Sequence, residues 1–400
     1  MITIEDIRIA HENIKSSIHK TPLIHSNSFS NLTGADVSIK AENLQKTGSF
    51  KVRGAFNKIM SISGNKVIAA SMGNHAQGVA FAAESLDKHA KIVMPVNAPI
   101  VKQEAAKGYG AEILIYGQSF QEALDFAMTQ KDYVFVHAYD DEVIIAGQGT
   151  IGLEIMEDAG HIDCVLVPVG GGGLIAGIST AVKSFSPETE VIGVQTESAA
   201  SAYFSFKEKK IIRRPPMSTL ADGIAVDQVG DKTLEVINKY VDDIVLVSED
   251  SIAMSILLFL ERKKLVVEGA GAVPLAVLME NKERFKGKRI VLIVSGGNID
   301  FTLIDKIINK GLVSSGRIGT FDVIVKDIPG SLHALTGLIA SNRGNILNIV
   351  HDRLAEDLSI GKAKLVFTIE TRGKRHLEEI IIQLAAEGYE LRRREPGADL

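Results

Sequence analysis

One lysine of this chain lies where its amine could do chemistry. Lys51 belongs to the segment Gly48-Ser49-Phe50-Lys51-Val52-Arg53-Gly54-Ala55, in which its neighbours are mostly small or apolar. Partial burial lowers the pKa of an amine and makes it a usable nucleophile. Taken alone, the same segment would also suit an ordinary surface lysine at the start of a helix, so the other loops must decide between the two interpretations.

A run of four glycines offers a site for a phosphate. Gly170, Gly171, Gly172 and Gly173 follow an apolar run that ends at Val169, and an apolar helix is predicted from Leu174. Backbone without Cβ atoms can wrap a phosphate and point its N–H groups and the positive end of a helix at it. The run also matches the dinucleotide fingerprint GxGxxA, with Glu197 near the expected ribose-binding acid. A tight turn without a ligand is less favoured, because glycines weaken any element they enter.

Two further loops carry polar side chains. Ser71-Met72-Gly73-Asn74-His75-Ala76-Gln77-Gly78 presents a hydroxyl, an amide and the start of a helix, which together suit a carboxylate. His75 is either a general base or a hydrogen-bonded structural residue, and the structural interpretation is favoured. Ser295 follows the strand-like run from Arg289 and precedes two glycines. It is either a ligand for a ring nitrogen or a plain turn residue.

Composition narrows the class of protein. The chain has 400 residues, of which 46% are hydrophobic, enough for a large core and at least two domains. Its formal net charge of −5 gives no basic field for nucleic acid or anionic lipid, so small-molecule ligands are expected. The single Cys164 cannot form an internal disulfide, and Thr3 with Asp6 predicts a helix capping box where a signal peptide would be apolar. We expect a cytoplasmic protein without a membrane span, since no apolar stretch approaches the roughly 20 residues required.

Short β-rich runs alternate with longer helical ones from about residue 36 to 310, which predicts an α/β fold of parallel sheets covered by helices. Several of these strands lead directly into glycine-rich turns, where ligands of open α/β sheets bind. The predicted strands are Val67 to Ser71, Lys91 to Pro95, Glu112 to Tyr116, Cys164 to Val169, Val191 to Gln195 and Arg289 to Ser295.

A second unit follows a stretch of small residues, Lys310 to Gly316. We predict a catalytic domain over 1–310 with a smaller subdomain inserted at about 41–145, a linker over 311–320, and a domain over 321–400. The last has the order βαββαβ of a ferredoxin-like domain. Its elements are a strand from Phe321 to Asp327, a helix from Ser331 to Asn342, strands from Ile346 to Arg353 and from Lys362 to Glu370, a helix from His376 to Glu387 and a strand from Tyr389 to Arg394, before a frayed tail.

Five motifs in order resemble the threonine dehydratases, or threonine ammonia-lyases, which are pyridoxal-phosphate (PLP) enzymes of fold type II. They are Ser49 to Ala55, Ser71 to Gly78, Gly170 to Gly173, Glu268-Gly269-Ala270-Gly271 and Ser295-Gly296-Gly297-Asn298. The resemblance covers roughly residues 1–310, and five motifs are far more specific than one glycine loop. Residues 321–400, with Asp327-Ile328-Pro329-Gly330-Ser331-Leu332, resemble an ACT domain, an amino-acid-sensing module.

The resemblance implies a role for each motif. Lys51 would bind PLP covalently and later act as the base at the substrate α-carbon, while Gly170 to Gly173 and Leu174 hold the phosphate. Asn74 would contact the 3-hydroxyl, Phe50 the ring, Ser295 the pyridine nitrogen and Glu268 that same edge; Ser71, Asn74 and His75 would surround the substrate carboxylate. The implied reaction eliminates the hydroxyl group of threonine to give 2-oxobutanoate and ammonia, and of serine to give pyruvate, as a first step of isoleucine biosynthesis.

Two departures from related enzymes sharpen the expectation. In related serine racemases the position of Met72 carries a serine that protonates the opposite face of the α-carbon, which methionine cannot do; weak racemase activity is expected. The same relatives bind a divalent metal through acidic side chains, where this chain has Gln195 and Ser201. We therefore predict no Mg or Ca site there and leave a monovalent cation open.

Other interpretations stay open from the sequence. The glycine run could serve an NAD-dependent oxidoreductase, and the same fold could carry a cysteine synthase-like β-replacement reaction. For the C-terminal domain we expect an amino-acid effector, isoleucine, at Asp327, Gly330, Ser331 and Leu332, facing Asn345 and Ile346 across a domain interface. The alternative is a dimerisation module that binds nothing. A homo-oligomer, dimer or tetramer, is expected in either case.

Overall fold

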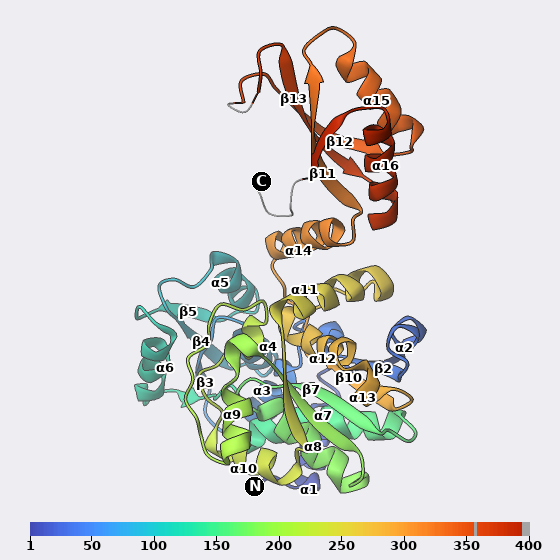
Figure 1. Cartoon of the computed structure of the whole chain (residues 1–400). Helices are drawn as coiled ribbons and strands as arrows, with labels where there is room; N and C mark the ends of the chain where they lie inside the picture. Colours follow the sequence, from blue (N-terminus) through green and yellow to red (C-terminus); the bar gives the residue numbers. More distant parts are fainter. Residues whose placement is uncertain (356–357, 394–400) are drawn as a thin grey trace. The chain divides into compact units, whose positions relative to one another are not determined.

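The chain forms two compact units, Met1–Asp300 and Phe301–Leu400 (Figure 1). The computed structural model describes residues 1–355 and 358–393. The helices and strands of the first unit carry the residues that were predicted to do chemistry. Each unit is described by itself below.

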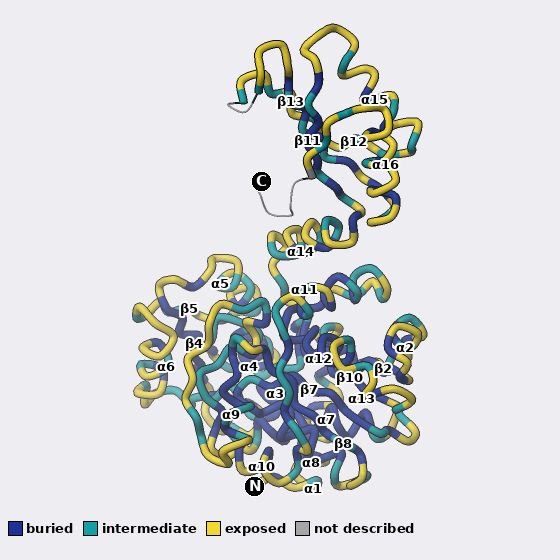
Figure 2. The backbone as a smooth tube through the Cα atoms, viewed as in Figure 1, coloured by how far each residue is buried: buried dark blue, intermediate teal, exposed yellow. Residues whose placement is uncertain are grey.

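The larger sheet of the first unit is buried on both faces, as Figure 2 shows for its central strands. Its strands are parallel except for the first, which pairs antiparallel with the second. Continuous apolar strands are typical of parallel sheets covered on both sides. In sheet order the strands are β1 (Leu23–His25), β2 (Asp36–Ala41), β10 (Arg289–Val294), β7 (Cys164–Pro168), β8 (Glu190–Thr196) and β9 (Asp243–Val247).

A second, smaller sheet lies within the segment predicted to form the inserted subdomain. All of its strands are parallel, in the order β5 (Glu112–Ile115), β4 (His89–Met94), β3 (Lys66–Ala70) and β6 (Val134–Phe135). The six strands predicted from the sequence are present within two residues at either end. The prediction missed β1, β2, β6 and β9. Two of these are very short, and β2 carries Lys40, whose charge hides the fact that its side chain is fully buried.

Helices cover both sheets of this unit. The capping box predicted at the first helix is confirmed: the Thr3 N–H donates to Asp6 Oδ2 at 2.8 Å, and the Asp6 N–H donates to Thr3 Oγ1 at 3.3 Å. Among the described residues, no helix is long and apolar enough to cross a membrane. The helices are α1 (Ile4–Ile14), α2 (Asn27–Thr33), α3 (Lys51–Met60), α4 (Asn74–Ser85), α5 (Ile100–Lys107), α6 (Phe120–Thr129), α7 (Glu142–Asp158), α8 (Gly173–Phe185), α9 (Ser201–Glu208), α10 (Asp231–Tyr240), α11 (Glu249–Leu258), α12 (Gly269–Glu280) and α13 (Lys282–Phe285).

The second unit has an antiparallel sheet in the order β12-β13-β11-β14, and its element order βαββαβ after the first helix confirms the ferredoxin-like prediction. Within the predicted linker, residues 311–314 complete a helix, and the next strand begins at Ile318. The predicted frayed tail lies outside the described residues. The elements are α14 (Phe301–Ser314), β11 (Ile318–Lys326), α15 (Ser331–Ser341), β12 (Asn345–Asp352), β13 (Lys362–Glu370), α16 (Lys374–Ala386) and β14 (Glu390–Arg393).

The sheet order of the first unit brings distant segments to one edge. β10 lies between β2 and β7, with Val294 opposite Ala41 and Leu292 opposite Leu166. Because these strands are parallel, the segments that follow them begin at the same edge. In the smaller sheet β3 pairs with β6, so residues 71–75 and 136–140 also begin side by side. These five loops contain the residues of the candidate site.

Candidate active site

Lys51 begins helix α3, and its amine faces the loop after β6. Its Nζ donates a hydrogen bond to the carbonyl oxygen of Ala138 at 2.9 Å and lies 5.2 Å from the centre of the Phe50 ring. Burial lowers the pKa of this amine to about 8, although the nearby Glu268 carboxylate raises it. This pKa gives Lys51 a larger neutral fraction near neutral pH than an ordinary lysine has, and the neutral amine is the form that can act as a nucleophile or a base.

Asn74 and Glu268 meet although they lie far apart in the sequence. Asn74 Nδ2 donates to both carboxylate oxygens of Glu268, at 2.9 and 3.0 Å, and Asn74 Oδ1 accepts from Asn298 Nδ2 at 2.8 Å. The amide of Asn74 is thereby fixed in one orientation. Burial raises the pKa of Glu268 to about 7, while the hydrogen bond from Asn74 acts to lower it. Asn298 ends the motif Ser295-Gly296-Gly297-Asn298, but nothing in the sequence indicated that its side chain would contact Asn74.

The glycine run forms the turn between β7 and α8. Gly172 is the N-cap of α8 and has φ of 94°, a left-handed conformation that favours glycine. A Cβ on Gly171 would lie 2.3 Å from the Tyr139 ring, so no other residue fits there. Leu174 is buried in the first turn of α8. The backbone N–H groups of this turn and the positive end of α8 are the features that would hold an anion.

Ser295 lies directly after β10 and is 2% exposed. Its carbonyl oxygen accepts from the Phe50 N–H at 3.0 Å, and Ser49 pairs with Gly296 in an isolated bridge. Within the described part of the chain, the buried hydroxyls of Ser49 and Ser295 have no hydrogen-bond partner. A buried hydroxyl without a partner is costly, and a bound polar ring would provide one.

His75 is held neutral. Its Nε2 lies 2.9 Å from the carbonyl oxygen of Val136, and burial lowers the pKa of the ring to about 3, with the charge of Lys51 acting in the same direction. A group so far from its charged form is a poor general base, which agrees with the structural interpretation of His75. Ser71 Oγ accepts from the Gly73 N–H at 3.1 Å and orders the loop before α4.

Sequence reasoning missed the loop from His137 to Asp140. Its contributions are the Ala138 carbonyl that holds Lys51 and the Tyr139 side chain that packs against Gly171. A backbone carbonyl leaves no signal in a sequence, and the preceding strand β6 has only two residues. The loop was therefore invisible to a search for apolar runs that end in glycines.

Gln195 and Ser201, where no divalent metal site was predicted, make hydrogen bonds within the chain. Gln195 Oε1 accepts from the Tyr203 N–H at 2.9 Å, and Ser201 Oγ donates to the carbonyl oxygen of Val226 at 3.1 Å. No group of three metal-ligating side chains occurs among residues 1–355 and 358–393.

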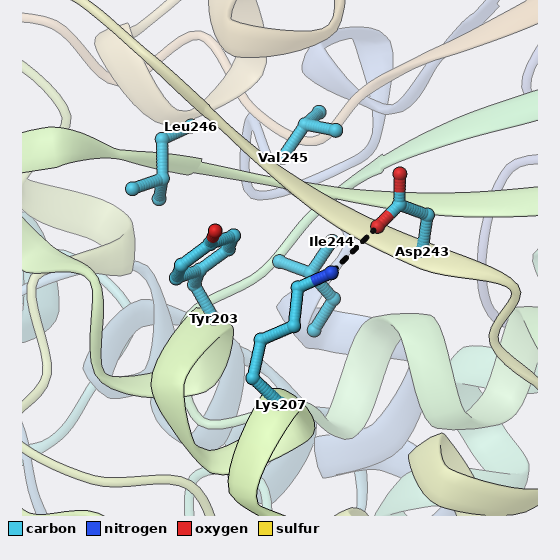
Figure 3. Close-up of a pocket in the computed structure, with 6 residues that line it drawn as sticks. All are labelled: Tyr203, Lys207, Asp243, Ile244, Val245 and Leu246. Carbon is cyan, nitrogen blue, oxygen red and sulfur yellow. Dashed lines mark ion pairs between the residues drawn. The ribbon is translucent and has the colours of Figure 1, made fainter.

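A shallow pocket of about 270 Å³ lies elsewhere, along β9 (Figure 3). Tyr203 and Lys207 of α9 line it together with residues 243–246. Lys207 Nζ lies 3.7 Å from Asp243 Oδ1, and Arg284 also pairs with Asp243. Its basic and acidic groups pair with one another, so it lacks the free nucleophile found at Lys51.

The predicted effector residues engage different partners. Asp327, after β11, accepts from Arg353 Nε at 3.0 Å, while Asn345 Nδ2 donates to Glu370 at 3.1 Å. Both β11 and β12 run antiparallel to β13, which places Asn345 and Ile346 opposite Glu370 and Ile369, at the far end of the sheet from Asp327. Gly330 has φ of 96° before α15, Ser331 Oγ donates to the carbonyl oxygen of Lys326 at 2.8 Å, and Leu332 is exposed.

Comparison with known proteins agrees with this site. A family model for pyridoxal-phosphate dependent enzymes matches residues 14–296. The L-threonine ammonia-lyase of Thermotoga maritima is 49% identical over 399 residues, covering 98% of this chain and 99% of that protein. A catabolic L-threonine dehydratase of Staphylococcus aureus is 45% identical and covers 80% of this chain and 96% of that protein. The crystal structure of a threonine deaminase from T.th. matches with a TM-score of 0.72 at 41% identity, covering 75% of this chain and 99% of that one.

The chain therefore belongs to the pyridoxal-phosphate dependent enzymes of fold type II. Within that class it belongs to the threonine ammonia-lyase family. This membership excludes the oxidoreductase interpretation of the glycine run. The residues of the site suit PLP: an anion-binding turn, an amine of lowered pKa and an unpartnered hydroxyl at Ser295 match the phosphate, the aldehyde and the ring nitrogen of that cofactor.

Proposed function

We propose that this protein is an L-threonine ammonia-lyase that uses PLP on Lys51 to convert threonine into 2-oxobutanoate and ammonia. The single observation that carries the proposal is the Lys51 amine, partly buried, of lowered pKa and held by Ala138 at the edge where the phosphate turn and Ser295 also begin. Family membership supports the cofactor and the reaction class.

The cofactor, when bound, supplies an electron sink that stabilises negative charge at the substrate α-carbon. In the proposal, Lys51 removes the α-proton, because a neutral amine can accept one. The backbone of residues 170–173 and the start of α8 hold the phosphate, and Phe50 packs beside the ring. Ser295 offers a neutral hydroxyl to the ring nitrogen and so leaves that nitrogen unprotonated, which weakens the sink and favours prompt loss of the β-hydroxyl.

Three side chains complete the proposed substrate site. Ser71, Asn74 and His75 belong to the loop and first turn of α4, whose N–H groups and positive helix end suit a carboxylate. The neutral His75 ring donates from Nε2 to the carbonyl oxygen of Val136 and so fixes the first turn of α4, while its low pKa keeps a further charge out of the site. Asn74, whose amide donates two hydrogen bonds to Glu268, would also contact the 3-hydroxyl of the cofactor.

Borohydride reduction followed by peptide mapping tests the proposal. We expect the reduced cofactor on the peptide that contains Lys51, and 2-oxobutanoate released from threonine without any added nucleophile. A label on another lysine would overturn the role of Lys51. Product formation that required a thiol would instead indicate a cysteine synthase-like β-replacement enzyme. Serine is proposed as a second substrate, since one methyl group is worth only about 1–3 kcal/mol of discrimination.

The C-terminal unit is proposed to be an ACT-type sensor of isoleucine in a biosynthetic enzyme. The sheet register supports one specific arrangement: because Asp327 and Asn345 lie at opposite ends of one sheet, a site that uses both needs two copies of the unit. The proposal therefore includes a homo-oligomer. A cytoplasmic location belongs to the same proposal, since the lone Cys164 is fully buried and free.

A further inference from the structure

The loop His137–Asp140 links the amine of Lys51 to the glycine run through contacts at each of its residues. Ala138 accepts the hydrogen bond from Lys51. Tyr139 packs its ring on Gly171 and its backbone on Gly173, where added Cβ atoms would lie 2.3 and 3.0 Å away. Residues 137–140 belong to no helix or strand, so a side chain must hold the loop in shape.

His137 holds the loop from within. Its Nδ1 accepts from the N–H groups of Tyr139 at 3.1 Å and Asp140 at 2.8 Å. Burial lowers the pKa of the ring, so the neutral form that can accept at Nδ1 is the stable one. The His137 side chain therefore holds the loop in shape, and the Asp140 carboxylate is left to contact helix α10.

Asp140 caps a helix to which it does not belong. Helix α10 begins after Gly230, which has no side chain to serve as a cap. Asp140 Oδ1 accepts from the N–H groups of Lys232 at 2.9 Å and Thr233 at 3.2 Å. A Cβ on Gly230 would lie 2.2 Å from this carboxylate, so the glycine makes room for it. The charge also suits the positive end of the helix.

Thr233 connects the start of helix α10 to the glycine run. Its Oγ1 donates to the carbonyl oxygen of Gly171 at 2.7 Å, and the Gly230 N–H donates to the same oxygen at 3.3 Å. A fixed carbonyl orients the peptide that follows it, and that peptide supplies the N–H group of Gly172 at the start of α8. The path thus runs from Lys51 through Asp140 and Thr233 to the anion-binding turn.

We propose that Asp140 and Thr233 are positioning residues that hold the glycine run in the shape that binds the cofactor phosphate. This inference rests on the proposed function, in which that run receives the phosphate. It predicts a loss that is specific to the phosphate group, because neither side chain is part of the surface proposed for the ring or the aldehyde.

The test compares PLP with pyridoxal, which lacks the phosphate, by fluorescence titration of the full chain stripped of cofactor. We expect Asp140→Ala and Thr233→Val each to weaken PLP by on the order of tenfold, the scale of a lost capping bond, and to leave pyridoxal within about twofold of wild type. Asp140→Asn and Thr233→Ser keep the acceptor and the donor and should restore PLP binding. Ser119→Ala removes the cap of the remote helix α6 and serves as the control, with both affinities unchanged.

Each outcome decides one question. Equal losses for PLP and pyridoxal, or none for either, would overturn the positioning role of Asp140 and Thr233. Because Thr233 is fully buried, the melting temperature of each variant is measured beside the affinities, and the PLP-to-pyridoxal ratio within one variant is independent of how much of it is folded. If Gly171→Ala also leaves this ratio at the wild-type value, the assignment of the glycine run to the phosphate fails. If Gly171→Ala alone lowers the affinity for PLP relative to that for pyridoxal, the proposed function stands and the inference about the loop fails.

Discussion

The chemistry of the site depends on how burial and neighbouring charges set the pKa values of single residues. Lys51 is partly buried and Glu268 is buried, which lowers the pKa of the amine and raises that of the carboxylate. Each therefore titrates close to neutrality, and the Glu268 carboxylate raises the pKa of Lys51. The fraction of Lys51 that is protonated therefore depends on whether Glu268 carries its negative charge.

Glu268→Gln should lower the pKa of Lys51 below its value of about 8. The carboxylate raises that pKa, and it is itself ionised above pH about 7, where Lys51 titrates. The rate at which the cofactor-free chain captures PLP, trapped with borohydride at a series of pH values, should rise through pH about 8 in the wild type and at lower pH in the variant. Glu197→Gln, which removes an exposed carboxylate, should leave the midpoint in place. An unchanged or higher midpoint for Glu268→Gln would contradict the prediction.

Met72 should determine whether the α-carbon regains its proton on the opposite face. Met72→Ser adds a hydroxyl that can donate there, whereas methionine cannot. Conversion of L-serine to D-serine, followed by chiral chromatography, should exceed that of a Met72→Ala control by a factor of about 100 or more, the usual range for a positioned acid. Similar racemisation by the alanine variant would show that space, and not a proton donor, limits the reaction.

At the scale of elements, helix α3 is fixed by a buried cluster of charges. Arg53 and Lys40 are fully buried. Arg53 Nε donates to Glu42 at 2.8 Å and its Nη1 to Glu154 at 2.6 Å, while Lys40 Nζ lies 2.6 Å from Glu154. Two positive and two negative groups thus balance inside the core, and they join β2, α3 and α7 two residues from Lys51.

Arg53→Met should lower the free energy of unfolding by about 3–5 kcal/mol, because it leaves the buried Glu42 carboxylate without its ion-pair partner and leaves Glu154 with Lys40 alone. Arg375→Met is the matched control: its ion pair with Glu379 is exposed, and its loss should cost less than about 0.5 kcal/mol. Urea unfolding measures both. A cost for Arg53→Met no greater than that of the control would mean that the cluster adds nothing to stability.

These elements also show which parts of the fold and of the candidate site could be predicted from the sequence. Strands β3, β7 and β10 were predictable because an apolar run ends in a glycine turn at each, and those turns held most of the residues assigned to the cofactor. Arg53 was read only as part of a motif, because a charged residue carries no sign that its partners are buried far away in the sequence. The loop His137–Asp140 was missed for a different reason: it acts through a carbonyl oxygen and through a cap on another helix.

The whole molecule combines a catalytic unit with a unit that some relatives lack. The S. aureus dehydratase, 96% of which is matched, covers only 80% of this chain, and the T.th. threonine deaminase structure covers 75% of it. The T. maritima relative matches 98% of this chain. Because these shorter chains are matched over nearly their whole length, the first unit here should fold and turn over threonine without the second.

Truncation after Asp300 should therefore keep threonine turnover and remove its response to isoleucine. In the full chain, isoleucine should weaken the use of threonine by a coupling of about 1–3 kcal/mol, measured as the shift in the threonine saturation curve. Asp327→Ala in the full chain should reduce that shift, because Asp327 is the acidic side chain of the proposed effector loop, whereas Arg375→Met, in the same unit but on the exposed face of α16, should not. Equal inhibition of the full and truncated chains would instead indicate that isoleucine competes with threonine at the catalytic site, for which Ser71, Asn74 and His75 are the proposed substrate residues.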